Sequence, residues 1–118
     1  MPLTIKRVYE PEADTDGTRF FVERLWPRGI RKDALAMEAW LKEVSPSPAL
    51  RQWYGHRPEH WPEFKQRYFA ELDGNPDAWQ PIAKAAREGN VTLLYSARDT
   101  ERNSALALKE YLERRAGS

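Results

Sequence analysis

The chain has 118 residues, which is enough for one domain with a single main hydrophobic core. With 41% hydrophobic residues, 31% charged residues and a net charge of +1, it lacks the strongly basic balance of a dedicated nucleic-acid-binding protein. Cysteine is absent, which excludes disulfides, thiolate metal sites and cysteine nucleophiles.

The first half of the chain contains two strand-like segments followed by two helix-like segments. β-Branched and aromatic residues predict strands over residues 3–9 and 19–26, with an acidic turn between them. Asp33 is expected to act as the N-cap of a helix over residues 34–44, because four apolar side chains there recur at i, i+3, i+4 and i+7. A serine followed by a proline then predicts a short helix over residues 48–54.

The second half of the chain predicts three further helices and a strand. Apolar residues at helical spacing indicate helices over residues 61–73 and 76–88, and each is followed directly by a glycine. The apolar run at residues 91–95 predicts a central, buried strand. A last helix is expected to start at Asp99 or Thr100 and to continue to about residue 115.

These elements predict one α/β domain over residues 1–118, with a small, mostly parallel sheet of about three strands covered by about five helices. The second and third strands are joined by a long helical segment, as a parallel crossover requires. Only nine residues separate the first two strands, so this pair could instead form an antiparallel hairpin.

A candidate ligand site follows from the ends of the predicted strands. Ligands of parallel α/β sheets bind beyond the carboxyl ends of the strands, and the loop after the third strand leads into a helix N-terminus that attracts anions. A glycine-rich phosphate loop is absent, so side chains are expected to supply most of the contacts. The candidate ligand-binding residues are Arg24, Trp26, Arg28, Tyr95, Ser96, Arg98 and Asn103.

Three residues are candidates for catalysis at the same edge, namely His56, Ser96 and Asp99, and Glu23 is a further acid–base group. Each has a structural alternative. Serine and aspartate often serve as helix caps, and a lone histidine often packs against aromatic rings. Glu23 and Arg24 could pair with charges from neighbouring elements.

No metal or cofactor is expected. His56 and His60 are four residues apart, but Pro58 interrupts a helix between them, and a third ligand is not evident. The sequence also lacks a recognisable cofactor-binding motif.

An ordered series of short motifs resembles the YeaO-like group of a bacterial domain-of-unknown-function family. The motifs are RLWPRG at residues 24–29, HxP at 56–58, YxxEL at 68–72 and LYSAxD at 94–99. The group usually has an aspartate where this chain has Glu23, which is one methylene longer. The resemblance implies a compact α/β fold and names no reaction. Residues 91–108 are also loosely similar to the strand–loop–helix of rhodaneses and low-molecular-weight phosphatases, without the cysteine that those proteins use.

Three functions are therefore considered. The first is a pocket that binds, or acts on, a small anionic ligand; the second is a nucleic-acid-binding module; the third is a protein-interaction domain that uses tryptophan-rich helices. The dispersed acidic residues argue against the second. The sequence has neither a membrane-spanning apolar run nor a signal-peptide pattern, so we expect a cytoplasmic location and no membrane partner. The sequence carries no signal for an oligomeric state.

Overall fold

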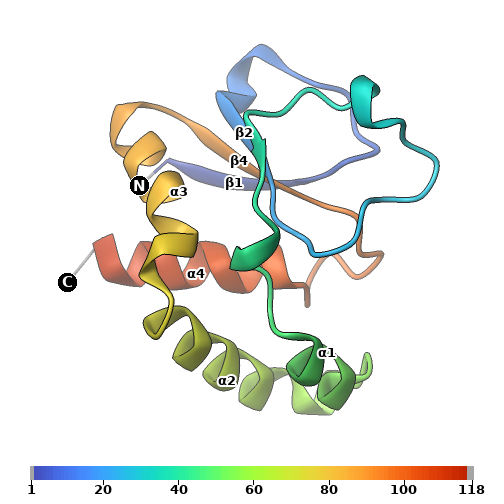
Figure 1. The fold of residues 1–118 in the computed structure, drawn as a ribbon, viewed down its shortest axis with the longest axis vertical. Coiled ribbons are helices and arrows are strands. Elements are labelled where there is room, and N and C mark those ends of the chain that lie inside the picture. The colour runs from blue at the N-terminus through green and yellow to red at the C-terminus, as the bar shows by residue number, and fades with distance from the viewer. Residues whose placement is uncertain (1, 117–118) are drawn as a thin grey trace.

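A computed structural model describes residues 2–116 of the chain (Figure 1). One sheet holds four strands, and each neighbouring pair is parallel. The strands are β1 (Leu3–Arg7), β2 (Thr18–Phe21), β3 (Ala39–Trp40) and β4 (Val91–Tyr95), and their order across the sheet is β1-β4-β2-β3. This confirms the α/β class and the mostly parallel sheet, with β4 in its interior.

Four α-helices lie on the same side of the sheet, and the long loops of the N-terminal half lie on the other (Figure 1). The helices are α1 (Pro48–Tyr54), α2 (Trp61–Asp73), α3 (Pro76–Glu88) and α4 (Ser104–Ala116). Short 3-10 turns are η1 (Asp14–Asp16), η2 (Lys32–Ala34), η3 (Lys42–Val44) and η4 (Pro58–His60). No helix within residues 2–116 is long and apolar enough to cross a membrane.

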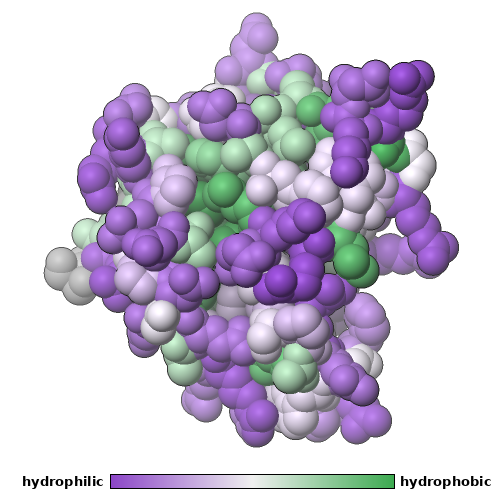
Figure 2. Space-filling model, viewed as in Figure 1, coloured by the Kyte–Doolittle hydropathy of each residue, from purple (hydrophilic) through white to green (hydrophobic). Residues whose placement is uncertain are grey.

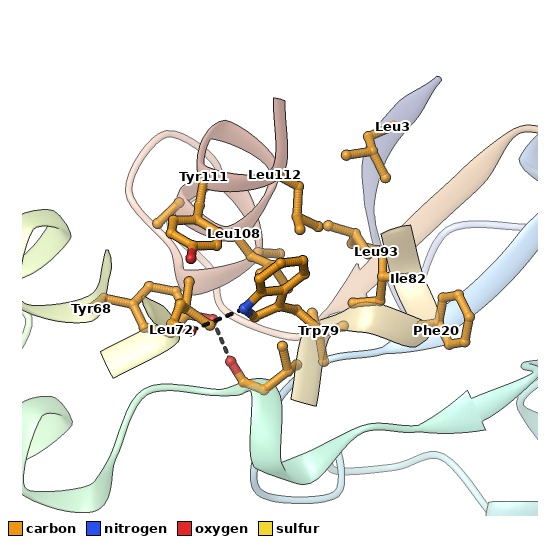
Figure 3. Close-up of a cluster of buried hydrophobic side chains, with 14 of the residues drawn as sticks. Leu3, Phe20, Tyr68, Leu72, Trp79, Ile82, Leu93, Leu108, Tyr111 and Leu112 are labelled. Carbon is orange, nitrogen blue, oxygen red and sulfur yellow. Dashed lines mark hydrogen bonds between the residues drawn. The ribbon is translucent and has the colours of Figure 1, made fainter. Parts of the chain in front are cut away.

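The alternation of side chains along the strands divides the interior into two hydrophobic clusters. The main cluster lies between the sheet and the helices, where the Trp79 indole N–H donates to the Leu72 carbonyl (3.0 Å) and the Tyr68 hydroxyl donates to the Val44 carbonyl (2.5 Å; Figure 3). Its labelled members in Figure 3 are Leu3, Phe20, Tyr68, Leu72, Trp79, Ile82, Leu93, Leu108, Tyr111 and Leu112.

A smaller cluster lies on the opposite face of the sheet, under the loops. It contains Val8, Phe21, Leu35 and Leu94, and half-buried tryptophans pack against it. The molecular surface in the view of Figure 1 is mostly hydrophilic, and its exposed hydrophobic side chains gather mainly over the strands (Figure 2). Both faces of the sheet are therefore covered, and a ligand site can form where the strands end.

The first two strands do not form a hairpin. Both pair in parallel with β4, which lies between them. The prediction that the second strand extends to residue 26 is wrong. The Val22 N–H donates to the Leu94 carbonyl (3.2 Å), but the next backbone donor of the partner strand, the Ser96 N–H, binds the Glu23 side chain (3.0 Å) and does not continue the ladder.

The predicted helix over residues 34–44 is also wrong. The segment instead forms η2, the short edge strand β3 and η3. The Leu41 N–H donates to the Phe21 carbonyl (2.8 Å), and the Trp40 indole N–H donates to the Glu23 carbonyl (2.7 Å). These contacts fix the segment against β2, so tertiary pairing determines its structure in spite of its helical spacing.

The last helix starts at Ser104 and not at residue 99 or 100. Asp99 holds a separate turn, since its Oδ1 accepts the backbone N–H groups of Glu101 and Arg102 (both 3.0 Å). The side chain of Asn103 caps α4 by accepting the Leu106 N–H (2.8 Å).

Candidate functional site

Two adjoining clefts open at the edge of the sheet where the parallel strands end. The first, of about 700 Å³, is lined on one side by Tyr54, Trp61 and Phe64, and we call it the aromatic cleft. The second, of about 560 Å³, is lined by residues 25–28 and by the end of β1, and we call it the rim cleft. Both volumes lie in the range of small-molecule sites.

The carboxylate of Glu23 lies against the loop that follows β4. Its Oε1 accepts both the backbone N–H of Ser96 (3.0 Å) and the Ser96 hydroxyl (2.5 Å), and Glu23 lines both clefts. The backbone position that was predicted to bind an external anion is thus occupied by a carboxylate of the chain itself. The other oxygen of Glu23, Oε2, has no hydrogen-bond partner within residues 2–116 and is available to a ligand.

The N-terminus of α4 is closed by its own side chains. Asn103 caps the helix and donates from Nδ2 to the Asp99 carbonyl (3.0 Å). Asp99 accepts the backbone N–H groups of Glu101 and Arg102 and the Arg102 Nε–H (3.1 Å), and these contacts hold its pKa below the usual value. Asp99 and Asn103 line the aromatic cleft, but their polar atoms hold the loop in place.

Three arginines that line the clefts have no partner for their side chains in the described part of the chain. Arg51 and Arg98 line both clefts, Arg28 lines the rim cleft, and all three are exposed. Arg7 differs, because it donates to the carbonyls of Ser96 (2.9 Å) and Ala97 (3.0 Å). Three guanidinium groups are therefore free to donate to an anion, for which their planar geometry is well suited.

His56 also lines both clefts, and its backbone conformation is unusual. Its φ of 58° is the only positive value for a non-glycine residue among residues 2–116. The left-handed conformation costs a residue with a Cβ about 1–2 kcal/mol, and such strain is concentrated at functional sites. The α1–η4 turn thus holds the imidazole at the clefts at a cost in stability.

The structure places the other predicted ligand-binding residues in three different parts of the molecule. Trp26 lines the rim cleft, and its indole N–H donates to the Ile30 carbonyl (2.6 Å). Arg24 lines instead a separate cleft of about 330 Å³. Its Nη1 lies 4.0 Å from the Glu43 Oε1, and its Nε is buried without a hydrogen bond. Tyr95 is 3% exposed in the main core and lines neither cleft.

Arg51 and the aromatic wall were not among the predicted site residues. Arg51 and Tyr54 reach the site only because α1 packs near the loop after β4, and this contact has no local signal in the sequence. The HxP motif at residues 56–58, together with Trp61 and Phe64, was the one available indication. Within residues 2–116, no group of three or more His, Cys, Asp or Glu side chains is arranged to hold a metal ion.

Comparison with known proteins gives a family and no named activity. The family model described as "Inactive DUF488-N3 subclade" matches residues 2–117. The uncharacterised protein YeaO of Escherichia coli is 41% identical over 112 residues, which are 95% of this chain and 97% of that protein. Uncharacterised proteins of Mycobacterium tuberculosis and Mycobacterium bovis are 40% identical over 111 residues, 94% of this chain and 93% of theirs. No solved structure matches. The comparisons add no support to the loose similarity with rhodaneses and phosphatases.

Proposed function

The chain belongs to the DUF488-N3i family, and from this premise and the geometry of the clefts we propose that it binds a small anionic ligand without transforming it. The single observation that carries the proposal is the set of three arginines, Arg28, Arg51 and Arg98, whose side chains line the clefts without a partner within residues 2–116. An anion in the clefts would receive charge-assisted hydrogen bonds from them.

Two observations favour binding over catalysis. The matching family model is described as inactive, and the chain has no cysteine nucleophile. Two of the three catalytic candidates also have structural roles, since Ser96 is bound to Glu23 and Asp99 holds the turn before α4. His56 is the remaining candidate, and in the proposal it contributes a hydrogen bond to the ligand.

The exposed side chains favour a pocket over a protein-interaction surface. Among the described residues, the exposed large hydrophobic side chains are Tyr9 (49%) and Leu25 (66%), and both lie at the rim cleft. The tryptophans of the helices are buried or half-buried, so they form no exposed apolar patch. The net charge of +1 argues against the nucleic-acid-binding alternative.

The proposal can be tested by titrating the protein with inorganic phosphate, sulfate and citrate and following heat and melting temperature. We expect phosphate to raise the melting temperature, and Arg51→Ala and Arg98→Ala each to weaken phosphate binding about tenfold. Arg87→Ala is the matched control, because Arg87 is exposed on α3 and lines neither cleft. The proposal fails if no anion stabilises the protein, or if Arg87→Ala weakens binding as much as the cleft variants do.

A further inference from the structure

We infer that the ligand joins a phosphate group to a planar ring and carries a hydrogen-bond donor between them, as a nucleoside monophosphate does. The inference rests on the proposed anion site and adds the chemistry of the rest of the ligand. Three features of the clefts lead to it: an aromatic wall, an excess of positive charge, and one carboxylate oxygen without a partner.

The aromatic wall is the first feature. Tyr54 and Trp61 are only partly buried, and both lie against Phe64, at ring-centroid distances of 4.8 Å and 5.3 Å. Burial and the nearby Asp99 carboxylate raise the pKa of Tyr54, and both residues line the aromatic cleft. The exposed parts of these two rings can stack with the planar ring of a base-like ligand.

The charge balance is the second feature. Five arginines and two carboxylates line the clefts together, which leaves an excess of three positive charges with histidine neutral. The arginines are Arg7, Arg28, Arg51, Arg98 and Arg102, and the carboxylates are Glu23 and Asp99. A single carboxylate on a ligand would neutralise one charge, whereas a phosphate monoester carries about −1.5 to −2 at pH 7. The excess therefore favours a phosphate.

The free oxygen of Glu23 is the third feature. Ser96 holds Oε1, so that Oε2 is a fixed acceptor in clefts that are also lined by the three arginines without a partner within residues 2–116. Its negative charge weakens the binding of a bare anion and is offset only by a ligand that brings an N–H or O–H group. Because Glu23 lines both clefts, it is placed to contact the part of the ligand between the ring and the phosphate.

The test compares adenosine monophosphate, ribose 5-phosphate, inorganic phosphate and adenosine by calorimetric titration of the whole chain. We expect adenosine monophosphate to bind about tenfold more tightly than ribose 5-phosphate, and ribose 5-phosphate more tightly than inorganic phosphate. Tyr54→Leu and Trp61→Leu should each weaken the monophosphate about fivefold and leave inorganic phosphate within about twofold. Phe69→Leu is the control, because Phe69 is a half-buried aromatic residue of α2 that lines neither cleft.

Glu23→Gln supplies a second, independent variant. A glutamine keeps a carbonyl oxygen for Ser96 and removes the negative charge, so it should strengthen the binding of inorganic phosphate about threefold. The same change should lower the preference for adenosine monophosphate over inorganic phosphate, because the charged acceptor is lost. The inference is contradicted if Glu23→Gln leaves both affinities unchanged.

The remaining outcomes separate this inference from the proposed function. If ribose 5-phosphate and inorganic phosphate bind as tightly as adenosine monophosphate, the inferred planar ring is contradicted and the proposed anion site is retained. If adenosine binds as tightly as its monophosphate, the inferred phosphate group is contradicted. A single-stranded oligonucleotide that binds more tightly than the monomer, with a steep salt dependence, overturns the inference in favour of a nucleic-acid-binding module. If none of these compounds binds and no other anion does, the proposed function fails as well.

Discussion

On the loop-covered face of the sheet a buried aspartate is paired with two cationic side chains, whereas at the ends of the strands three arginines line two clefts without carboxylate partners within residues 2–116. Asp16 is 6% exposed and accepts hydrogen bonds from Lys6 (2.7 Å), Arg19 (2.5 Å) and the Ala13 N–H (3.1 Å). Arg19 is equally buried and also donates to the Ala36 carbonyl (2.8 Å). We call these residues the Asp16 cluster.

The difference shows where charge serves the fold and where it is left for a ligand. A buried charge without a partner is very unfavourable, so the Asp16 cluster is expected to be internally satisfied. The exposed arginines at the clefts cost the fold little, because water solvates them, and they add little to its stability. Changes in the Asp16 cluster should therefore alter stability, and changes at the clefts should alter binding.

The largest expected effect is that of Asp16→Asn. The substitution leaves buried Arg19 without its charged partner and should lower the free energy of unfolding by about 3 kcal/mol, measured by urea denaturation. Phosphate affinity should remain unchanged. Asp14→Asn is the control, because Asp14 lies exposed in the same turn, and it should change stability by less than about 0.5 kcal/mol. A loss of less than about 1 kcal/mol for Asp16→Asn would show that the cluster is not needed for stability.

The second prediction concerns the pH dependence of the same cluster. Burial alone would raise the pKa of Asp16, but hydrogen bonds from Lys6, the Ala13 N–H and Arg19 outweigh it and lower the pKa to about 2. Since the folded pKa lies below the unfolded value of about 3.9, the ionised carboxylate contributes stability that is fully present above about pH 4 and lost as the pH falls towards about 2.

Urea denaturation of the wild type and Asp16→Asn at a series of pH values measures this contribution directly. The difference in unfolding free energy between the two proteins should be constant near neutral pH and shrink between about pH 4 and about pH 2. A difference that stays constant down to about pH 2 would mean that the carboxylate has an ordinary pKa in the folded state or is not charged there.

The sequence predicted well those elements whose signals are local. The Ser47 hydroxyl accepts the Leu50 N–H (3.1 Å) at the start of α1, as a serine before a proline indicates, and the apolar run of β4 lies inside the sheet. Residues 34–44 were mispredicted because their helical spacing is a local signal, whereas the pairing of Ala39–Trp40 with β2 and the packing of Trp40 on the second cluster arise only in the folded chain.

In the candidate site, too, the residues with a local signal were predicted and those placed by long-range packing were not. Arg28 and Arg98 lie beyond the ends of strands, so the rule for parallel sheets placed them at the edge where the clefts open, and both line the clefts. Arg51 could not be found in this way, because it reaches the clefts through the packing of α1 against a loop more than forty residues further along the chain. The pairing of Glu23 with Ser96, separated by 73 positions, depends equally on the folded structure.

The third prediction uses the strained backbone of His56. Glycine adopts a positive φ freely and alanine does not, so His56→Gly should be more stable than His56→Ala by about 1 kcal/mol in thermal or urea unfolding. Both variants lack the imidazole, so both should weaken phosphate binding to the same extent. Equal stability of the two variants would show that the turn relaxes and that the conformation is not a fixed cost of the site.

The smallest expected effect on stability is that of Arg98→Ala, and it is the strictest test of the comparison. Arg98 and Arg102 lie on the same loop, but Arg102 is bound to Asp99 (3.1 Å) and Arg98 has no partner within residues 2–116. Arg98→Ala should change the free energy of unfolding by less than about 0.5 kcal/mol. Arg102→Ala should lower the free energy of unfolding by up to about 1 kcal/mol, which is the usual contribution of an exposed ion pair. If Arg98→Ala is the more destabilising of the two, Arg98 stabilises the fold. The presence of an ion-pair partner then does not predict which charged residues act on stability and which act on binding.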